Sequence, residues 1–379
     1  MIRKPLCEIA DIQTGPFGSQ LHKEDYVEFG TPIVTVEHLG HRVFTEQNLP
    51  KVSSEDKQRL NKYVLSEGDI VFSRVGSVDR CSYVDREHDG WMFSGRCLRV
   101  RPNEEINSLF LYYFFCLEDT KQFVSNIAVG ATMPSINTKL MGEIPIVYPD
   151  LDTQTKIAEI LSRIDDKIET NDKINQNLLQ QADAIFKERF LNLEMPVGWK
   201  QMTLSEISDM SAGGDKPKDI SEQKINEYKY PVYSNGISDD GLYGFTTDYK
   251  ISEESVTVSA RGTIGFVCLR HIPYTPIVRL VTLVPHTDLV SAKYLYLWLK
   301  NIPIHGTGTT QQQLTVPDFK KTEIIVPTEY DMKAFTDTVD PMFKQVWKNQ
   351  EENEKLANLR DALLPRLMSG ELDVSDIDL

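Results

Sequence analysis

The sequence predicts a mixed α and β fold in which two similar globular parts alternate with two long helices. Three observations predict it: a block of sequence occurs twice, each copy contains a helical pattern, and short β-branched runs precede each helix. A chain of 379 residues suffices for two or three domains with ordinary cores. The expected order is a globular part at 1–150, a helical region at 151–195, a second globular part at 196–327 and a second helical region at 328–379.

The repeat holds without gaps across the end of each globular part and the helix that follows it. Adding 178 to a residue number in the first copy gives the matching residue in the second. One unit used twice predicts two similar working surfaces related by an internal two-fold axis. The matching pairs include Gly130 with Gly308, Thr132 with Thr310, Ile146 with Ile324, Pro149 with Pro327, Asn171 with Asn349, Asn175 with Asn353 and Leu178 with Leu356.

Residues 156–190 carry a helical pattern, because apolar residues recur in steps of three and four. The apolar stripe is narrow, which favours a helix paired with another helix over a helix lying on a sheet. We expect the first helix to end near Leu193, and we expect Pro365 and Gly370 to mark the end of the second. The stripe comprises Ile157, Leu161, Ile164, Ile168, Leu178 and Ile185, matched by Phe335, Val339, Met342, Val346, Leu356 and Leu363.

Asparagines interrupt the stripe at matching positions of both helices. Two copies related by an internal two-fold axis must run antiparallel, so the numbers of paired residues add to a constant. Asn171 with Asn353 and Asn175 with Asn349 both give 524, so one register pairs all four side chains. Buried asparagine pairs cost stability but fix register and orientation. The alternative is that all four are exposed polar residues on a helix face.

The globular parts also match each other, but with a drifting offset, so their insertions differ. Short β-branched runs predict strands at 33–36, 69–72, 255–259 and 277–283. Asn107-Ser108 and Ser291 predict the N-terminal cap of one helix in each copy. The helices keep their spacing while the globular parts diverge. This pattern is expected of a common frame that carries two different readers.

The overall charge argues against a simple nucleic-acid binder. Net charge is −15, whereas domains that bind nucleic acid are usually basic. The acidic residues concentrate, relative to length, in 328–379, where twelve acidic residues face six basic ones. Within 74–101 the sign reverses, which leaves room for a local basic face. The arginines of that segment are Arg74, Arg80, Arg86, Arg96, Arg99 and Arg101.

Composition also limits where the chain works. Hydrophobic content of 40% and charged content of 26% indicate a globular protein. The longest apolar run, 109–117, is about half of the ~18 residues of a membrane span, and the start shows no secretory signal. Five cysteines without a Cys-x-x-Cys pair predict reduced thiols in a cytoplasm and no zinc site.

The usual motifs of catalysis are absent from the sequence. There is no Gly-x-x-x-x-Gly-Lys loop, no Gly-x-Ser-x-Gly elbow and no His-Glu-x-x-His pair. Asp340-Pro-Met-Phe is similar to the Asp-Pro-Pro-Phe motif of amino-methylating enzymes. It lies inside the helix stripe, however, without the glycine-rich cofactor strand that should accompany it. We therefore expect no catalytic residue and no metal site on this chain.

Two pairs of loops carry candidate binding groups. Arg74 and Arg261 each follow a predicted strand, beside Gly, Ser or Thr. Such a loop donates to phosphates and base edges of DNA, but it equally suits a turn with an internal ion pair. The second pair, 130–137 and 308–315, offers amides, and glutamine pairs bidentately with adenine; the alternative is a solvated loop that supports the next strand. The candidate contacts are Arg74, Ser77, Arg80, Thr132, Ser135, Asn137, Arg261, Thr263, Gln311, Gln312 and Gln313.

The aromatic clusters at 112–115 and 294–298 are a further candidate. Their spacing predicts core helices; the alternative is a pair of platforms on which bases stack.

Three stretches together resemble the specificity subunit of type I restriction–modification systems. Met195-Pro-Val-Gly-Trp-Lys followed by Leu204-Ser-Glu-Ile is similar to the opening of that family's target recognition domains. Ile144-Pro-Ile-Val-Tyr-Pro followed by Gln154 resembles its entry into a helical region. Leu363-Leu-Pro-Arg-Leu-Met-Ser-Gly-Glu-Leu is similar to its C-terminal signature. The resemblance covers essentially the whole chain, except that the Pro-x-Gly-Trp lead is missing before Leu6.

The resemblance implies two target recognition domains that each read half of a bipartite DNA site. The two helices would form an antiparallel coiled coil that sets the gap between the halves. They would also dock two modification (methyltransferase) subunits, which bind S-adenosylmethionine and methylate adenine, and restriction subunits that use ATP and magnesium. This chain itself would hold no cofactor and catalyse nothing.

Two other functions are compatible with the residues alone. The first is a scaffold whose globular parts bind proteins, which the charge of −15 supports. The second is a standalone methyltransferase that relies on Asp340-Pro-Met-Phe. Binding to duplex DNA distinguishes the first from a DNA reader, and binding of S-adenosylmethionine tests the second.

Overall fold

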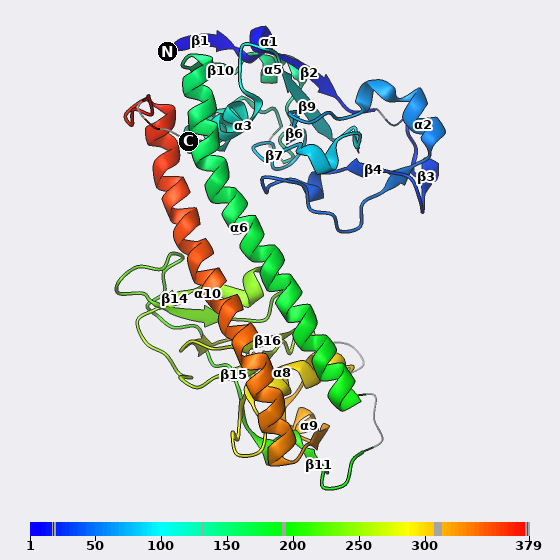
Figure 1. Cartoon of the computed structure of the whole chain (residues 1–379), viewed down its shortest axis with the longest axis vertical. Helices are drawn as coiled ribbons and strands as arrows, with labels where there is room; N and C mark the ends of the chain where they lie inside the picture. The colour runs from blue at the N-terminus through cyan, green and yellow to red at the C-terminus, as the bar shows by residue number, and fades with distance from the viewer. Residues whose placement is uncertain are drawn as a thin grey trace. The chain divides into compact units, whose positions relative to one another are not determined.

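The computed structural model describes the chain except residues 17, 19, 131, 192–194, 307–312, 376, 378 and 379. The fold is mixed α and β and has two compact units. Unit 1 is Met1–Asn171 with Glu351–Leu379, and unit 2 is Asp172–Gln350. Two long helices, α6 (Leu151–Phe186) and α10 (Glu329–Met368), contribute residues to both units (Figure 1). Each unit therefore combines one globular part with segments of both helices.

Unit 1 is built on a four-stranded antiparallel sheet with the order β2-β9-β6-β7. A second set of strands, β3-β5-β4-β8, includes the parallel pair β4 with β8, and β1 pairs with β10. The strands are β1 (Ile2–Pro5), β2 (Ala10–Thr14), β3 (Tyr26–Val27), β4 (Thr31–Val34), β5 (Lys51–Val52), β6 (Ile70–Ser73), β7 (Cys81–Tyr83), β8 (Met92–Phe93), β9 (Cys97–Pro102) and β10 (Pro145–Tyr148).

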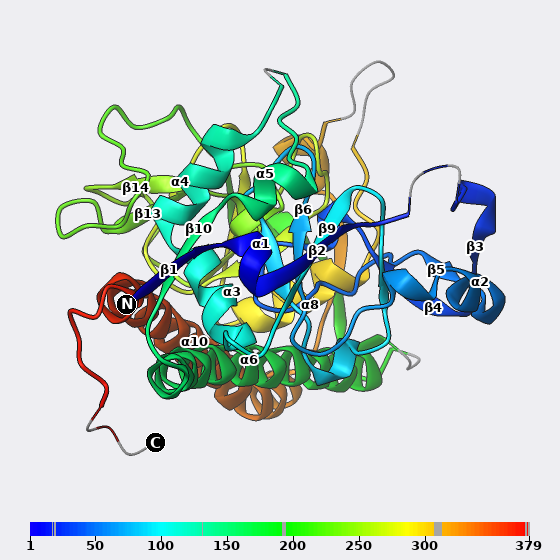
Figure 2. The same cartoon turned by 90° about the horizontal axis from the view of Figure 1, so that it is seen from above.

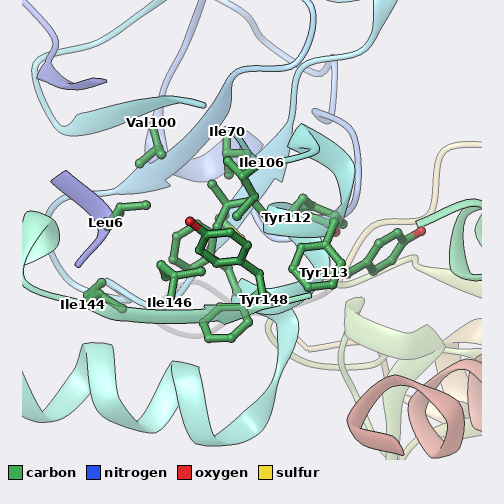
Figure 3. Packing of buried hydrophobic residues seen from close by; sticks show 14 of the residues in the cluster. Leu6, Ile70, Val100, Ile106, Tyr112, Tyr113, Ile144, Ile146 and Tyr148 are labelled. Atoms are coloured by element: carbon green, nitrogen blue, oxygen red, sulfur yellow. The ribbon is translucent and has the colours of Figure 1, made fainter. Parts of the chain in front are cut away.

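Helices α3 (Ser108–Cys116) and α5 (Thr138–Gly142) contact this sheet, and α3 also shares a core with α6. Asn107 caps α3 through its side-chain oxygen, and the apolar run that follows makes α3 buried on nearly every face. Figures 1 and 2 both show α3 beside α6, and both helices contribute to one core. Side chains from β6, β9, α3 and β10 gather in that core (Figure 3). The α-helices are α1 (Leu6–Ile9), α2 (Ser54–Arg59), α3 (Ser108–Cys116), α4 (Glu118–Ile127) and α5 (Thr138–Gly142).

Unit 2 repeats this topology in the corresponding order. Its main sheet runs β12-β18-β15-β16, and its smaller sheet, β14-β13-β17, again contains one parallel pair. The π-helical turn Lys187–Leu191 follows α6. The strands are β11 (Lys200–Thr203), β12 (Ser208–Ala212), β13 (Tyr230–Tyr233), β14 (Leu242–Thr246), β15 (Ser255–Val258), β16 (Val267–Arg270), β17 (Thr275–Pro276), β18 (Val281–Pro285) and β19 (Glu323–Val326); the α-helices are α7 (Leu204–Ile207), α8 (Ala292–Asn301) and α9 (Val316–Phe319).

Most of the local predictions agree with these elements, but one strand does not. Asn107 and Ser291 cap α3 and α8 as expected. The strand expected at 277–283 forms only from Val281 onward. Val278 and Arg279 have φ values of 50° and 60°, a left-handed conformation that interrupts a strand. Their N–H groups bond to the carbonyls of Gly214 and Gly213 instead.

The long helices depart from the sequence prediction at their ends. α6 begins at Leu151, where the Asp150 carboxylate accepts from the Thr153 N–H at 3.0 Å. α10 continues through Pro365 to Met368, and Gly370, with φ of 77°, follows its end. Pro365 lies inside the last turn, where it removes one backbone donor, and the helix ends between Pro365 and Gly370, the two residues expected to mark its end.

The apolar stripe packs against more than the other helix. In unit 1, Ile157 and Leu161 join the core formed by the sheet and α3. In unit 2, Phe335 and Val339 do the same with the second sheet and α8. The prediction that the narrow stripe contacts another helix rather than a sheet was therefore wrong, because stripe residues of both helices pack on the globular parts. The helices also hold the globular parts.

The asparagines form two hydrogen-bonded pairs, one in each unit. In unit 1 the Asn171 amide donates to Asn353 Oδ1 at 2.8 Å and to Glu352 at 3.0 Å. In unit 2 the Asn349 amide donates to Asn175 Oδ1 at 2.8 Å. Asn171, Asn175 and Asn349 are buried. These are the two pairs whose numbers add to 524, and in each unit the helix segments run antiparallel.

Replacing both Asn175 and Asn349 by leucine is expected to raise the free energy of unfolding by about 1–2 kcal/mol. The change removes two buried polar groups together and adds apolar area inside the core. Thermal unfolding measures the effect, and single Asn175→Leu, which leaves Asn349 without its partner, is the matched control and should destabilise. A double variant less stable than the wild type would contradict this expectation.

Candidate nucleic-acid interface

In unit 1 two loops that lie far apart in the sequence are joined side by side. The first connects β6 to β7, and the second, at 129–137, precedes α5. The Gly76 N–H donates to the Pro134 carbonyl at 2.8 Å, and the Ile136 N–H donates to the Arg74 carbonyl at 3.0 Å. Gly76 and Gly130 take φ values of 77° and 115°, where other residues are strained. The structure thus brings both predicted loops of this copy together.

The candidate side chains of unit 1 divide into exposed groups and groups with structural partners. Ser77, Arg80 and Thr132 are exposed. Arg74 is half-buried, and its Nη1 donates to the Gly95 carbonyl at 3.3 Å. The Arg74 backbone N–H donates to the carbonyl of Arg96. The Arg96 side chain is exposed, like that of Arg80. Donors for phosphate or base edges are therefore concentrated at one end of this sheet.

Two other candidates of unit 1 have hydrogen-bond partners within the loop or in the helix α5 that follows it. The Asn137 side chain caps α5 by accepting from the Leu140 N–H at 2.9 Å. The Ser135 hydroxyl donates to the Val129 carbonyl at 3.2 Å. Both residues shape the loop, a role that their sequence context did not reveal, because Asn and Ser suit caps and turns as well as base contacts.

In unit 2 the corresponding segments also meet, as far as the structure describes them, at residues 259–266 and 313–315. Residues 259–266 connect β15 to β16, and the Leu314 N–H donates to the Ala260 carbonyl at 3.0 Å. Arg261 and Thr263 are exposed. Arg261 Nη2 donates to Gln313 Oε1 at 3.0 Å. Gln311 and Gln312 lie outside the described residues.

Not all arginines of the segment 74–101 are available on the surface of unit 1. Arg99 is buried and donates to the Asp11 carboxylate. Arg101 donates to both oxygens of Asp69 at 2.7 Å, and this hydrogen bond raises the pKa of Arg101. Ion pairs within the fold therefore occupy these two arginines. Arg80 and Arg96 remain at the surface near the loop pair.

Sequence reasoning missed an exposed apolar side chain in the same loop. Met133 is 67% exposed, between residues 129 and 135 that are bridged by two backbone hydrogen bonds of 2.9 Å. Gly130 and the bridge hold the loop in a tight turn. The signal available from the sequence was an apolar residue between Thr132 and Pro134, which is too weak to identify a surface contact.

Sequence reasoning also missed a buried polar network that ties the first globular part to both helices. Asp165 of α6 accepts from the Tyr113 hydroxyl at 2.6 Å and from Arg360 Nη1 of α10 at 2.7 Å. Arg42 donates to Glu169 at 2.8 Å and also to Asp166. Burial raises the pKa of Tyr113, and the neighbouring Asp165 charge adds to that effect.

The contacts between Arg42, Asp166 and Glu169 also shift the pKa values of Arg42 and Glu169. Burial alone would lower the pKa of Arg42, but its hydrogen bond with Asp166 and the charge of Glu169 raise it overall. Burial raises the pKa of Glu169, although Arg42 opposes the change.

In unit 2 different side chains connect the globular part to the long helix α10. Lys293 of α8 is buried and donates to both carboxylate oxygens of Glu254 at 2.7 Å. It also pairs with Asp340 of α10 at 3.1 Å. His271 stacks on Trp347 of α10 with ring centroids 4.2 Å apart. Asp340-Pro-Met-Phe is therefore part of a helix, and its aspartate holds a structural lysine.

The burial of the aromatic clusters decides between the two interpretations that the sequence left open. The clusters at 112–115 and 294–298 lie mainly in the two cores, so they are not platforms for bases. Within the described ranges no group of three or more His, Cys, Asp or Glu side chains is placed to hold a metal ion. No helix in the described part of the chain has the length and apolar content of a membrane span.

Known proteins resemble the chain along most of its length. The model of the type I restriction modification DNA specificity domain matches residues 3–180 and 196–358. A putative type I specificity subunit of Mycoplasma pneumoniae is 34% identical over 251 residues, which is 65% of this chain and 67% of that protein. The HindI specificity subunit of Haemophilus influenzae is 25% identical over 406 residues, covering 82% of this chain and 88% of that protein.

A solved structure shares the fold. The type I restriction–modification S subunit of M. genitalium aligns with a TM-score of 0.62 at 16% identity, covering 97% of this chain and 95% of that one. The two family matches fall on the two copies of the repeat. The chain belongs to the type I restriction–modification DNA specificity family.

Proposed function

We propose that this chain is the non-catalytic DNA reader of a type I restriction–modification complex. Each globular part reads one half of a bipartite duplex site, and α6 and α10 set the gap between the halves. The observation that carries this proposal is the repeated loop pair at the same strands, β6–β7 and β15–β16, with exposed Arg, Ser and Thr side chains. Two equivalent loop pairs with different side chains suit two different half-sequences.

The chemistry of these loops fits the edges of base pairs. In unit 1 the exposed groups are Arg80, Ser77 and Thr132, and in unit 2 they are Arg261 and Thr263. Arginine pairs with guanine, and hydroxyl groups bond to several base edges in the major groove. The loops are short and hydrogen-bonded at their bases, so the donors are held in place before DNA arrives.

The partners in this proposal are two modification subunits and, for cleavage, restriction subunits. S-adenosylmethionine, ATP and magnesium belong to those partners, and this chain holds no cofactor. The acidic segment 328–379 lies on the helical part of the chain, which suits docking to protein rather than to phosphate. A DNA-reading role and five free thiols both fit the cytoplasm.

Selection from a randomised duplex pool tests the proposal. The full chain, co-expressed with a type I methyltransferase subunit from the same source, should enrich a motif of two defined halves with a fixed gap. Substituting Arg80 by alanine should relax one half, and substituting Arg261 should relax the other. A complex that binds without enriching any motif would favour the protein-binding scaffold.

A further inference from the structure

Gln313, which the sequence offers as a candidate base contact, is hydrogen-bonded to another candidate residue in the structure. Its side-chain oxygen accepts from Arg261 Nη2 at 3.0 Å. Arg261 is exposed on the β15–β16 loop, whereas Gln313 is half-buried and comes from a segment 52 residues later. The glutamine therefore meets the arginine from the second loop of the pair.

The backbone holds both residues in place. The Ala260 N–H donates to Asn235 Oδ1 at 2.7 Å, and the Thr263 N–H donates to the Arg261 carbonyl at 2.9 Å. On the other side, Leu314 is buried in the core of unit 2, and its N–H bonds to the Ala260 carbonyl. The contact thus joins two anchored segments.

One hydrogen bond to Nη2 leaves most of the guanidinium donors available. Arginine carries five N–H donors in a planar fork, and that fork matches O6 and N7 of guanine. Phosphate accepts a donor from many directions, whereas a base edge requires a set orientation. A partner that orients the fork in the exposed loop therefore suits a base contact more than a phosphate contact.

We propose that Arg261 reads a guanine in the half-site of unit 2, and that Gln313 is a positioning residue for Arg261. The inference rests on the proposed function. Arg74, the equivalent arginine of unit 1, is half-buried and donates to the Gly95 carbonyl. The two arginines therefore differ in exposure and in hydrogen-bond partner. The inference therefore concerns the arginine and glutamine of unit 2 and does not extend to Arg74.

The test starts from the motif that the wild-type complex selects from the duplex pool. The half-site of unit 2 is the one that Arg261→Ala relaxes, and each guanine in it is replaced in turn by 7-deazaguanine, which lacks N7. One such replacement should weaken wild-type binding about tenfold. The same replacement should leave the affinity of Arg261→Ala unchanged.

Variants separate positioning and charge from direct contact. Arg261→Lys keeps the charge but loses the fork, so it should lose the 7-deazaguanine effect; a phosphate contact would leave its affinity near that of the wild type. Gln313→Leu should weaken binding about three- to tenfold and reduce the 7-deazaguanine effect. Gln313→Glu keeps the acceptor and should restore that effect. Thermal unfolding of each complex shows that the variants are folded.

The outcomes distinguish the inference from the function on which it rests. No enriched motif would overturn the proposed function. A motif whose unit 2 half contains no guanine sensitive to the loss of N7, or a Gln313→Leu complex that keeps the full effect, would overturn this inference and leave DNA reading intact.

Discussion

Replacing Asp165 by alanine is expected to lower the free energy of unfolding by about 3–5 kcal/mol. Asp165 is 5% exposed, and its carboxylate accepts from the Tyr113 hydroxyl and from Arg360. Alanine leaves a buried hydroxyl and a partly buried guanidinium without their shared acceptor. These groups connect α3, α6 and α10, so the loss loosens the attachment of the first globular part to the helices.

Asp166 provides the matched control for this experiment. It is the next residue on α6 and also bonds to an arginine, Arg42, but its side chain is 58% exposed. Ion pairs with an exposed member contribute about 0–1 kcal/mol, so Asp166→Ala should have a small effect. Chemical denaturation followed by circular dichroism measures both. Equal losses for the two variants would show that the network is not buried in solution.

Replacing Lys293 by leucine is expected to cost unit 2 a similar 3–5 kcal/mol. The ammonium group lies between Glu254 and Asp340 and 5.2 Å from the Trp347 ring. Leucine fills much of the space but leaves two carboxylates close together without the buried cation between them. Repulsion between them adds to the cost of burial.

The effect of Lys293→Leu is measured by the same denaturation, with Lys344→Leu as control. Lys344 is 70% exposed and reaches Asp340 at 3.7 Å, so its loss should cost less than about 1 kcal/mol. The triple variant Lys293→Leu, Glu254→Leu and Asp340→Leu removes the charges together and should recover much of the stability. Failure to recover would show that the lysine acts by packing rather than by charge.

The sequence predicted the parts of the fold that follow from local pattern and from the repeat. The two long helices, the caps Asn107 and Ser291, and the asparagine pairs all depend on spacing along one chain or on symmetry between its copies. They are present in the structure. Spacing carries this information because apolar and polar positions on a helix repeat every three to four residues.

The missed features depend on contacts between distant segments. Nothing local shows that Val278 and Arg279 leave the strand conformation to bond to Gly213 and Gly214. The partners of Arg99 and Arg101 likewise lie 88 and 32 residues away. The residue type of Gln313 likewise did not reveal its hydrogen bond to Arg261, which lies 52 residues earlier in the chain.

In the proposed function the two long helices form a frame, and the globular parts are the readers. Inserting four residues between Asp172 and Lys173, and four between Glu351 and Glu352, keeps the pairing whose numbers add to 524 on both sides of the insertion. Four residues lengthen a helix by about 6 Å, which corresponds to about two base pairs of DNA. Selection from a randomised duplex pool should therefore return both original half-sequences with a gap longer by about one to two base pairs. Changed half-sequences with the original gap would contradict the division into frame and readers.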